Sequence, residues 1–448
     1  MTDSEISDEK RKRSTFGVVF LTIFLDMVGF SVLFPLFPEM LDHYLDRESI
    51  QGGGLVSDFV SMIQQYSFVG SDSHSFRIET VIFGGALGSL YAILQFFFAP
   101  IWGRLSDRIG RRSVLTYTLG GTCLGYALWI FAGDFWLLVI SRILGGIAGG
   151  NLSVATAAIA DVTSREARSK GMALVGIAFG LGFILGPALG GFASEWDWSL
   201  NSNAIFGFTP FSFAASISLL LALVNWGWII FYFRETLPVE KRVKENQPKP
   251  AIFQLGKIIN KSVRSTCLVY FLYMISFSGM EFTLTFLAVE RFGYKPMQLA
   301  TMFLIIGVTL IFAQGFFVRR YVGRIGEKGM ALLGILLGAF AFVLVSQSFD
   351  EMKFFIALFL MSCGVALISP TLTALTSLHS GEQDQGFHLG VFRSSGSMAR
   401  ALGPVLAGFA YFFYGSSTAY LMGATILVLP FIILIRVPQP ITHSNKKA

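Results

Sequence analysis

The chain has 448 residues, of which 53% are hydrophobic and 14% are charged, and 46 are phenylalanine. Soluble domains carry about 25% charged residues, so this composition excludes an ordinary soluble protein. The formal net charge of +6 does not indicate nucleic-acid binding, because the basic residues lie in short loops between long apolar segments. Cys123, Cys267 and Cys363 lie inside apolar segments without metal-ligand spacing, so we expect neither a disulfide framework nor a metal site.

Long apolar segments follow one another along the whole chain. Each has roughly 20 residues, enough for a ~30 Å hydrocarbon core at 1.5 Å per residue. We therefore expect an all-α membrane protein whose twelve transmembrane helices cover Phe16–Pro38, Val81–Trp102, Val114–Gly133, Phe135–Ala160, Gly171–Ala193, Thr209–Phe233, Ser265–Val289, Gln298–Val318, Gly329–Ser346, Phe354–Leu378, Leu389–Tyr414 and Thr418–Ile435.

Lysine and arginine are distributed unevenly among the loops between these spans. Of the 34 residues, 26 lie on one side, in both terminal tails and four loops, whereas 5 lie on the other side and three lie within spans. Basic loops are retained in the cytoplasm, so we expect both termini there and the long loop 39–80 outside.

Two sequence repeats indicate that the chain is built from two similar halves. DRIGRR at Asp107–Arg112 recurs as GRIGEK at Gly323–Lys328, and LGPALGGF at Leu185–Phe192 recurs as LGPVLAGF at Leu402–Phe409. The second copy of the first repeat has lost the acidic residue. We expect these domains: a tail over 1–15, a six-helix half over 16–233, a linker over 234–264, a six-helix half over 265–435 and a tail over 436–448.

The connection between the second and third spans holds one carboxylate and four arginines within Gly103–Ser113 (GRLSDRIGRRS). It resembles the G-x-L-x-D-R-x-G-R-R loop of the major facilitator superfamily. The resemblance implies pseudo-symmetric halves around a midplane site, and a gating role for this loop. The alternative is that its arginines only set topology. Glycine would let the turn tighten and the helices approach. The candidate gating residues are Gly103, Asp107, Arg108, Gly110, Arg111 and Arg112.

The fifth span contains a stripe of glycines that suits close helix packing. It resembles the antiporter signature G-x(3)-G-P-x(2)-G-G of the same superfamily, and this resemblance implies export. The residues of this helix-packing antiporter motif are Gly182, Gly186, Pro187, Gly190 and Gly191.

Charged side chains inside spans are costly and mark pathways or ion pairs. Asp26 lies ~15 Å and Arg142 ~20 Å from the cytoplasmic side at 1.5 Å per residue, so an ion pair between them is possible. Such a pair is either structural or functional. No histidine lies within a span, which leaves carboxylates as proton carriers. Asp26, Arg142 and Glu281 are our proton-coupling candidates.

A second set of polar residues predicts the substrate site. Glu281 lies just past the middle of the seventh span, and Arg400 lies ~16 Å deep in the eleventh, whereas Arg393 is close enough to the interface to reach it. Asn151 and Tyr273 are uncharged polar groups at mid-span, for which bonding to a neighbouring helix is an equal alternative. The candidate substrate-binding residues are Glu281, Arg400, Asn151 and Tyr273.

The motifs that are missing narrow the function further. The sequence has no phosphate-binding Gly-x(4)-Gly-Lys-Ser/Thr loop and no catalytic triad, so we expect no cofactor, no metal and no enzyme activity. The chain resembles the drug:proton antiporters of the superfamily, the group that contains the tetracycline exporters. This resemblance implies proton-coupled export of amphipathic organic molecules, with membrane lipid around a monomer in a eukaryotic plasma or internal membrane. A lipid or metabolite transporter and a non-transporting receptor on the same scaffold are the alternatives.

Overall fold

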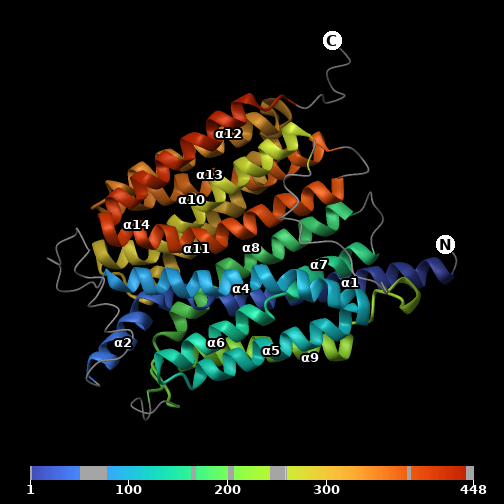
Figure 1. Cartoon of the computed structure of the whole chain (residues 1–448), viewed down its shortest axis with the longest axis horizontal. Coiled ribbons are helices and arrows are strands. Elements are labelled where there is room, and N and C mark those ends of the chain that lie inside the picture. The colour runs from blue at the N-terminus through green and yellow to red at the C-terminus, as the bar shows by residue number, and fades with distance from the viewer. Residues whose placement is uncertain are drawn as a thin grey trace. The chain divides into compact units, whose positions relative to one another are not determined.

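The computed structural model describes residues 3–50, 78–162, 168–199, 206–242, 258, 260–380 and 385–439, and the described chain is almost entirely helical (Figure 1). The elements are α1 (Asp3–Ser31), η1 (Phe34–Leu36), α2 (Phe37–Ile50), α4 (Glu79–Ile109), α5 (Arg111–Ile130), α6 (Phe135–Ala148), α7 (Asn151–Val162), α8 (Arg168–Ala193), α9 (Ser212–Tyr232), η2 (Val239–Lys241), α10 (Lys261–Phe292), α11 (Pro296–Phe312), η4 (Ala313–Val318), α12 (Arg319–Ser346), α13 (Glu351–His379) and α14 (Gln385–Arg436).

Every one of the expected spans lies on a helical segment. Within the described residues, nine helical segments are long and apolar enough to cross a membrane. One of them, Phe387–Arg436, covers two expected spans, and α5 and α8 cover the two others that are not among the nine. The chain is therefore an all-α membrane protein.

Left-handed glycines end helices where the sequence predicts loops. Gly110 has φ 104° between α4 and α5, and Gly326 has φ 78° inside α12, at the corresponding position of the repeat. Gly415 has φ 79° and divides α14 between the last two expected spans. Glycine adopts these angles without the steric cost that a Cβ brings, so each glycine fixes a turn.

The helices form two compact units. Unit 1 contains Met1–Gly52, Leu90–Pro248 and Tyr294–Leu304, and unit 2 contains Gly53–Ser89, Lys249–Gly293 and Ile305–Ala448. The boundary between the units falls within two helices, after Ser89 in α4 and after Leu304 in α11. The expected division at residues 16–233 and 265–435 stays a prediction.

The first expected span and the outer loop after it differ from the prediction. Helix α1 ends at Ser31, before Pro35, and a short 3-10 turn leads into α2, which continues to Ile50. Proline tolerates the first turn of a helix but not its interior, which explains the break. The beginning of the expected loop 39–80 is therefore helical, and its residues 51–77 lie outside the described part of the chain.

The fourth expected span, 135–160, is two helices instead of one. Helix α6 ends at Ala148 and α7 begins at Asn151, with Gly149 and Gly150 between them. The freed carbonyl groups accept hydrogen bonds from α4: Gln95 Nε2 donates to Gly149 O at 2.9 Å, and Trp102 Nε1 donates to Ile147 O at 2.6 Å. Broken membrane helices persist where neighbouring side chains satisfy the backbone in this way.

Helix α8 lies close against α1 along its glycines. A Cβ at Gly182 would come within 2.5 Å of Met27 Cβ, and a Cβ at Gly186 would overlap the hydroxyl of Ser31. Ser31 Oγ donates to Gly182 O at 3.0 Å across the same contact. Only glycine permits this backbone approach.

Candidate functional site

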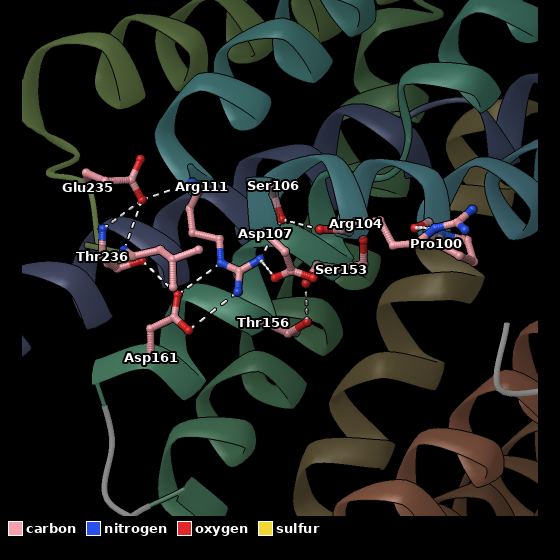
Figure 2. A network of polar contacts seen from close by, with 12 residues as sticks. Pro100, Arg104, Ser106, Asp107, Arg111, Ser153, Thr156, Asp161, Glu235 and Thr236 are labelled. Carbon is pink, nitrogen blue, oxygen red and sulfur yellow. Dashed lines mark hydrogen bonds and ion pairs between the residues drawn. The ribbon is translucent and has the colours of Figure 1, made fainter. Parts of the chain in front are cut away.

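The loop between α4 and α5 contains a network of charged side chains in unit 1 (Figure 2). Because Gly110 turns the chain, Arg111 is the first residue of α5 and its side chain returns toward the end of α4. Arg111 Nη1 forms an ion pair with Asp107 at 2.6 Å and also donates to Ser106 Oγ at 2.6 Å. The Arg111 side chain is 7% exposed, so this is a buried cation that needs such partners.

The second anion for Arg111 comes from α7. Arg111 Nε donates to Asp161 Oδ2 at 3.0 Å, and the hydroxyl of Thr236 donates to the same oxygen at 3.1 Å. Burial lowers the pKa of Arg111, but the hydrogen bond and charge of Asp161 and the charge of Asp107 outweigh it, so this pKa lies above its ordinary value. The guanidinium therefore joins α4, α5 and α7 as a permanent cation.

Glu235 caps the beginning of α5 from the segment after α9. Its carboxylate accepts hydrogen bonds from the backbone N–H groups of Arg111 at 2.9 Å and Arg112 at 3.2 Å. The first N–H groups of a helix have no partner within the helix, and the positive end of the helix dipole favours an anion there. Arg242 lies 3.9 Å from the same carboxylate.

The remaining gating candidates take less part in this network. Arg112 is exposed and donates to Ile230 O. Arg108 is exposed and has no hydrogen bond or ion pair within the described chain. The expected packing role of Gly103 is wrong for this structure, because a Cβ there would meet nothing within 4 Å. The described residues leave room for a side chain at this position, so helix packing does not require glycine there.

Ser106 of the network was not among the sequence candidates, and neither were three residues from other segments: Asp161, Glu235 and Thr236. Their signal is nevertheless in the sequence, because ADV at 160–162 and RET at 234–236 place one carboxylate each at the expected cytoplasmic ends of the fourth and sixth spans. The distribution of lysine and arginine among the loops does not reveal these acidic residues. A buried arginine requires anionic partners, so the few acidic residues of the adjacent loops are the place to look for them.

Asp26 and Asn151 meet within unit 1. Asn151 Nδ2 donates to Asp26 Oδ1 at 2.8 Å and thereby joins α7 to α1, while Asn151 Oδ1 accepts from the backbone N–H of Leu152 at 2.8 Å. Asn151 is 1% exposed, and Asp26 is half-buried. Asn151 thus bonds to a neighbouring helix, which was the alternative to its role as a substrate-binding residue. The residue that it contacts there, Asp26, is a proton-coupling candidate.

The expected ion pair between Asp26 and Arg142 is absent from the described structure. Arg142 lies over the ring of Trp129, with 4.7 Å between Cζ and the centroid, and 5.7 Å from the ring of Tyr126. Its Nε contacts Ser141 Oγ at 3.3 Å. Aromatic faces attract a desolvated guanidinium, so α5 satisfies Arg142 without a carboxylate.

The substrate-site candidates of the second half lie within unit 2. Glu281 is half-buried and Arg400 is exposed, and the two charges interact without forming an ion pair within 4.0 Å. Tyr273 is 2% exposed, interacts electrostatically with Glu281 and stacks on Phe277 with a centroid distance of 5.8 Å. Helices α10 and α14 therefore bring Glu281, Tyr273 and Arg400 into one region. Within the described residues, no group of three or more His, Cys, Asp or Glu could hold a metal ion.

Comparison with known proteins agrees with this architecture. The model of the Major Facilitator Superfamily matches residues 19–386 and 315–448. Major facilitator superfamily domain-containing protein 10 of Mus musculus is 33% identical over 464 residues, covering 97% of this chain and 95% of the relative. The class E tetracycline resistance protein of Escherichia coli is 29% identical over 449 residues, covering 96% and 98%.

A solved structure shows the same fold. The crystal structure of the human organic anion transporter MFSD10 (TETRAN) superposes with a TM-score of 0.74 at 31% sequence identity, covering 94% of this chain and 99% of that one. The expected resemblance to the superfamily and to its tetracycline exporters is thus confirmed. The chain belongs to the major facilitator superfamily and is a multi-pass membrane transporter.

Proposed function

We propose that the chain exports amphipathic organic molecules that bear an acidic group, by alternating access coupled to proton entry. Two of its relatives support this proposal. The human protein with the same fold is an organic anion transporter, and the bacterial relative is a tetracycline resistance protein. The glycine stripe of α8 supports export through its resemblance to the antiporter signature.

The proposal that transport is coupled to protons rests on the environment of Asp26. Its hydrogen-bond partner within the described chain is the neutral amide of Asn151, and it has no ion pair with Arg142. A carboxylate inside a membrane span is a functional residue by default. One that is bonded to an amide can accept a proton without separating an ion pair, which suits a proton carrier.

Substitution of Asp26 tests the coupling. In proteoliposomes with an imposed pH gradient, Asp26→Asn should abolish gradient-driven transport of a fluorescent aromatic carboxylate and leave exchange of labelled for unlabelled substrate measurable. Asp350→Asn is the matched control, because Asp350 caps the beginning of α13 and asparagine caps equally well. Retention of gradient-driven transport by Asp26→Asn would move the coupling site elsewhere, with Glu281 next in order.

The preference for an acidic substrate rests on Arg400 and Glu281. Arg400 is exposed and lies outside ion-pair distance of Glu281, which leaves its guanidinium able to bind a substrate carboxylate. Arg400→Ala should weaken binding of organic anions much more than binding of lipophilic cations, and Glu281→Gln should mainly shift the pH optimum. An equal loss for both substrate classes would instead favour a structural role for the two residues.

The same transport assay in proteoliposomes distinguishes proton-coupled export from the two alternatives, a lipid or metabolite transporter and a non-transporting receptor. Transport that ignores the pH gradient in the unmodified protein would indicate a uniporter for lipids or metabolites. Binding without any transport would indicate a receptor. Both outcomes would contradict proton-coupled export.

A further inference from the structure

Helix α7 makes a polar contact with another helix at each of its two ends. At its beginning, Asn151 Nδ2 donates to Asp26 Oδ1 of α1 at 2.8 Å. Near its end, Asp161 Oδ2 accepts from Arg111 Nε of α5 at 3.0 Å. The two residues are ten positions apart, which corresponds to ~15 Å along a helix. One short helix therefore connects the candidate proton site with the charge network of the cytoplasmic loop.

The break before α7 separates this helix from α6. Gly150 N donates to Ala148 O at 2.7 Å in a tight turn, and the bonds from Gln95 and Trp102 satisfy the carbonyl groups of Gly149 and Ile147. The backbone therefore loses little hydrogen bonding at the break. Sharp helix bends occur at glycines, so the break offers a hinge between α7 and α6, which carries the buried Arg142.

Protonation of Asp26 changes the contact at the beginning of α7. The ionised carboxylate receives a charge-assisted hydrogen bond from Asn151, whereas the protonated carboxyl loses that assistance and gains an O–H donor. The charge of Asp26 acts on three titratable groups of the described chain, Tyr91 of α4 and Cys123 and Tyr126 of α5, and Arg142 also acts on both tyrosines.

We propose that Asn151 is a positioning residue that transmits the protonation state of Asp26 through α7, hinged at Gly149–Gly150, to the contact between Asp161 and Arg111. The inference rests on the proposed role of Asp26 as the proton carrier. It adds a physical route by which protonation of a residue inside the membrane changes a contact of the cytoplasmic loop. The opposing interpretation is that Asn151 only holds α7 against α1.

A cysteine at Gly103 reports on the loop. This position lies one helical turn before Asp107, and the space around a Cβ there is open, so the reporter disturbs no contact. Gly103→Cys is placed in a background with Cys123, Cys267 and Cys363 changed to alanine. The rate of reaction with a maleimide is then measured on purified protein in acidic and in alkaline buffer. Each rate is divided by the rate of the same protein after unfolding in that buffer, because the reactive thiolate becomes scarcer as the pH falls.

This normalised rate should be higher in acidic buffer, because the weaker bond to Asp26 loosens α7 and then the Asp161 contact. Hydrogen bonds to charged groups shift equilibria by about tenfold or more, so the two normalised rates should differ by about tenfold. Asn151→Leu should make the rates equal, and Asn151→Gln, which keeps the amide, should retain part of the difference. Thr156→Val is the matched control on α7, because Thr156 Oγ1 bonds within its own helix to Ser153 O, and it should keep the full difference.

A full pH response in a folded Asn151→Leu protein, or an equal loss in Thr156→Val, would overturn the inference. Thermal unfolding shows which variants are folded. If Asn151→Leu does not fold, Asn151→Gln decides: an unchanged response contradicts the inference, and a reduced one supports it. Gradient-driven transport is measured on the same protein before substitution. Loss of coupling there would overturn the proposed function itself, whereas coupled transport with an unaltered response in the Asn151 variants would overturn the inference alone.

Discussion

Arg111 shows how one buried side chain holds three helices. Its nitrogens contact Asp107, Asp161 and Ser106, and its backbone N–H is bonded to Glu235. A guanidinium presents several donors in a fixed plane, whereas the ammonium group of lysine is a single point of charge. The geometry of the network therefore requires arginine, although the topology of the loop would be equally well served by lysine.

We expect Arg111→Lys to lower the free energy of unfolding by about 1–3 kcal/mol, because at least one carboxylate loses its charge-assisted bond to the buried Arg111 side chain. Thermal unfolding in detergent measures this effect. Arg108→Lys is the control, because Arg108 is exposed without a described partner, and surface changes of this kind stay within about 0.5 kcal/mol. Equal stability of the two variants would show that the network is not built on the guanidinium.

Two glycines of the same motif should respond in opposite directions to alanine. Gly110 has φ 104° and ψ 153°, a conformation open only to glycine, and a Cβ there would collide with Glu235. Gly110→Ala should therefore destabilise the protein by about 1–3 kcal/mol. Gly103→Ala should stabilise α4 by about 0.5–1 kcal/mol, because Gly103 lies in a helix with open space around it. Melting temperatures that move together would contradict this reading of the turn.

Helix α8 offers a similar contrast at the scale of an element. Gly186→Ala should destabilise unit 1 by about 1–3 kcal/mol and reduce transport, because the added methyl group meets Ser31 and lies 2.7 Å from Val28 O. Gly180→Ala, on the same helix, meets nothing within 4 Å and should be tolerated. Thermal unfolding and vesicle uptake of the two variants provide the comparison. A tolerated Gly186→Ala would mean that α1 and α8 separate easily.

Helix positions could be predicted from the sequence, because apolar length alone determines what crosses a bilayer. The break at Gly149–Gly150 could not, since it depends on Gln95 and Trp102 of another helix, which no local pattern reveals. Depth along a helix put Glu281 and Arg400 at the edge of direct pairing, and in the structure their charges interact without forming an ion pair. It failed for Asp26 and Arg142, because depth says nothing about the direction in which a side chain points around the helix axis.

At the scale of the whole molecule, the orientation in the membrane is the main expectation still open to measurement. Single cysteines at Ser199 and Glu240, both exposed, should react with a membrane-impermeant reagent from opposite sides of intact cells, in a background without the three native cysteines. The excess of basic residues places Glu240 in the cytoplasm and Ser199 outside. Reaction of Glu240→Cys from outside the cell would contradict the predicted orientation of the chain in the membrane.

The cap that Glu235 forms on α5 changes where the first half of the chain ends as a folding unit. A fragment cut after Phe233, the predicted end of this half, would lose Glu235 and Thr236, and with them the cap of α5 and one partner of Asp161. A fragment that continues through Arg242 would keep both. The first residues of the linker thus belong to the fold of the half before them. Fragment ends, fusion joints or tags placed between Phe233 and Glu235 would remove the cap and expose the first N–H groups of α5.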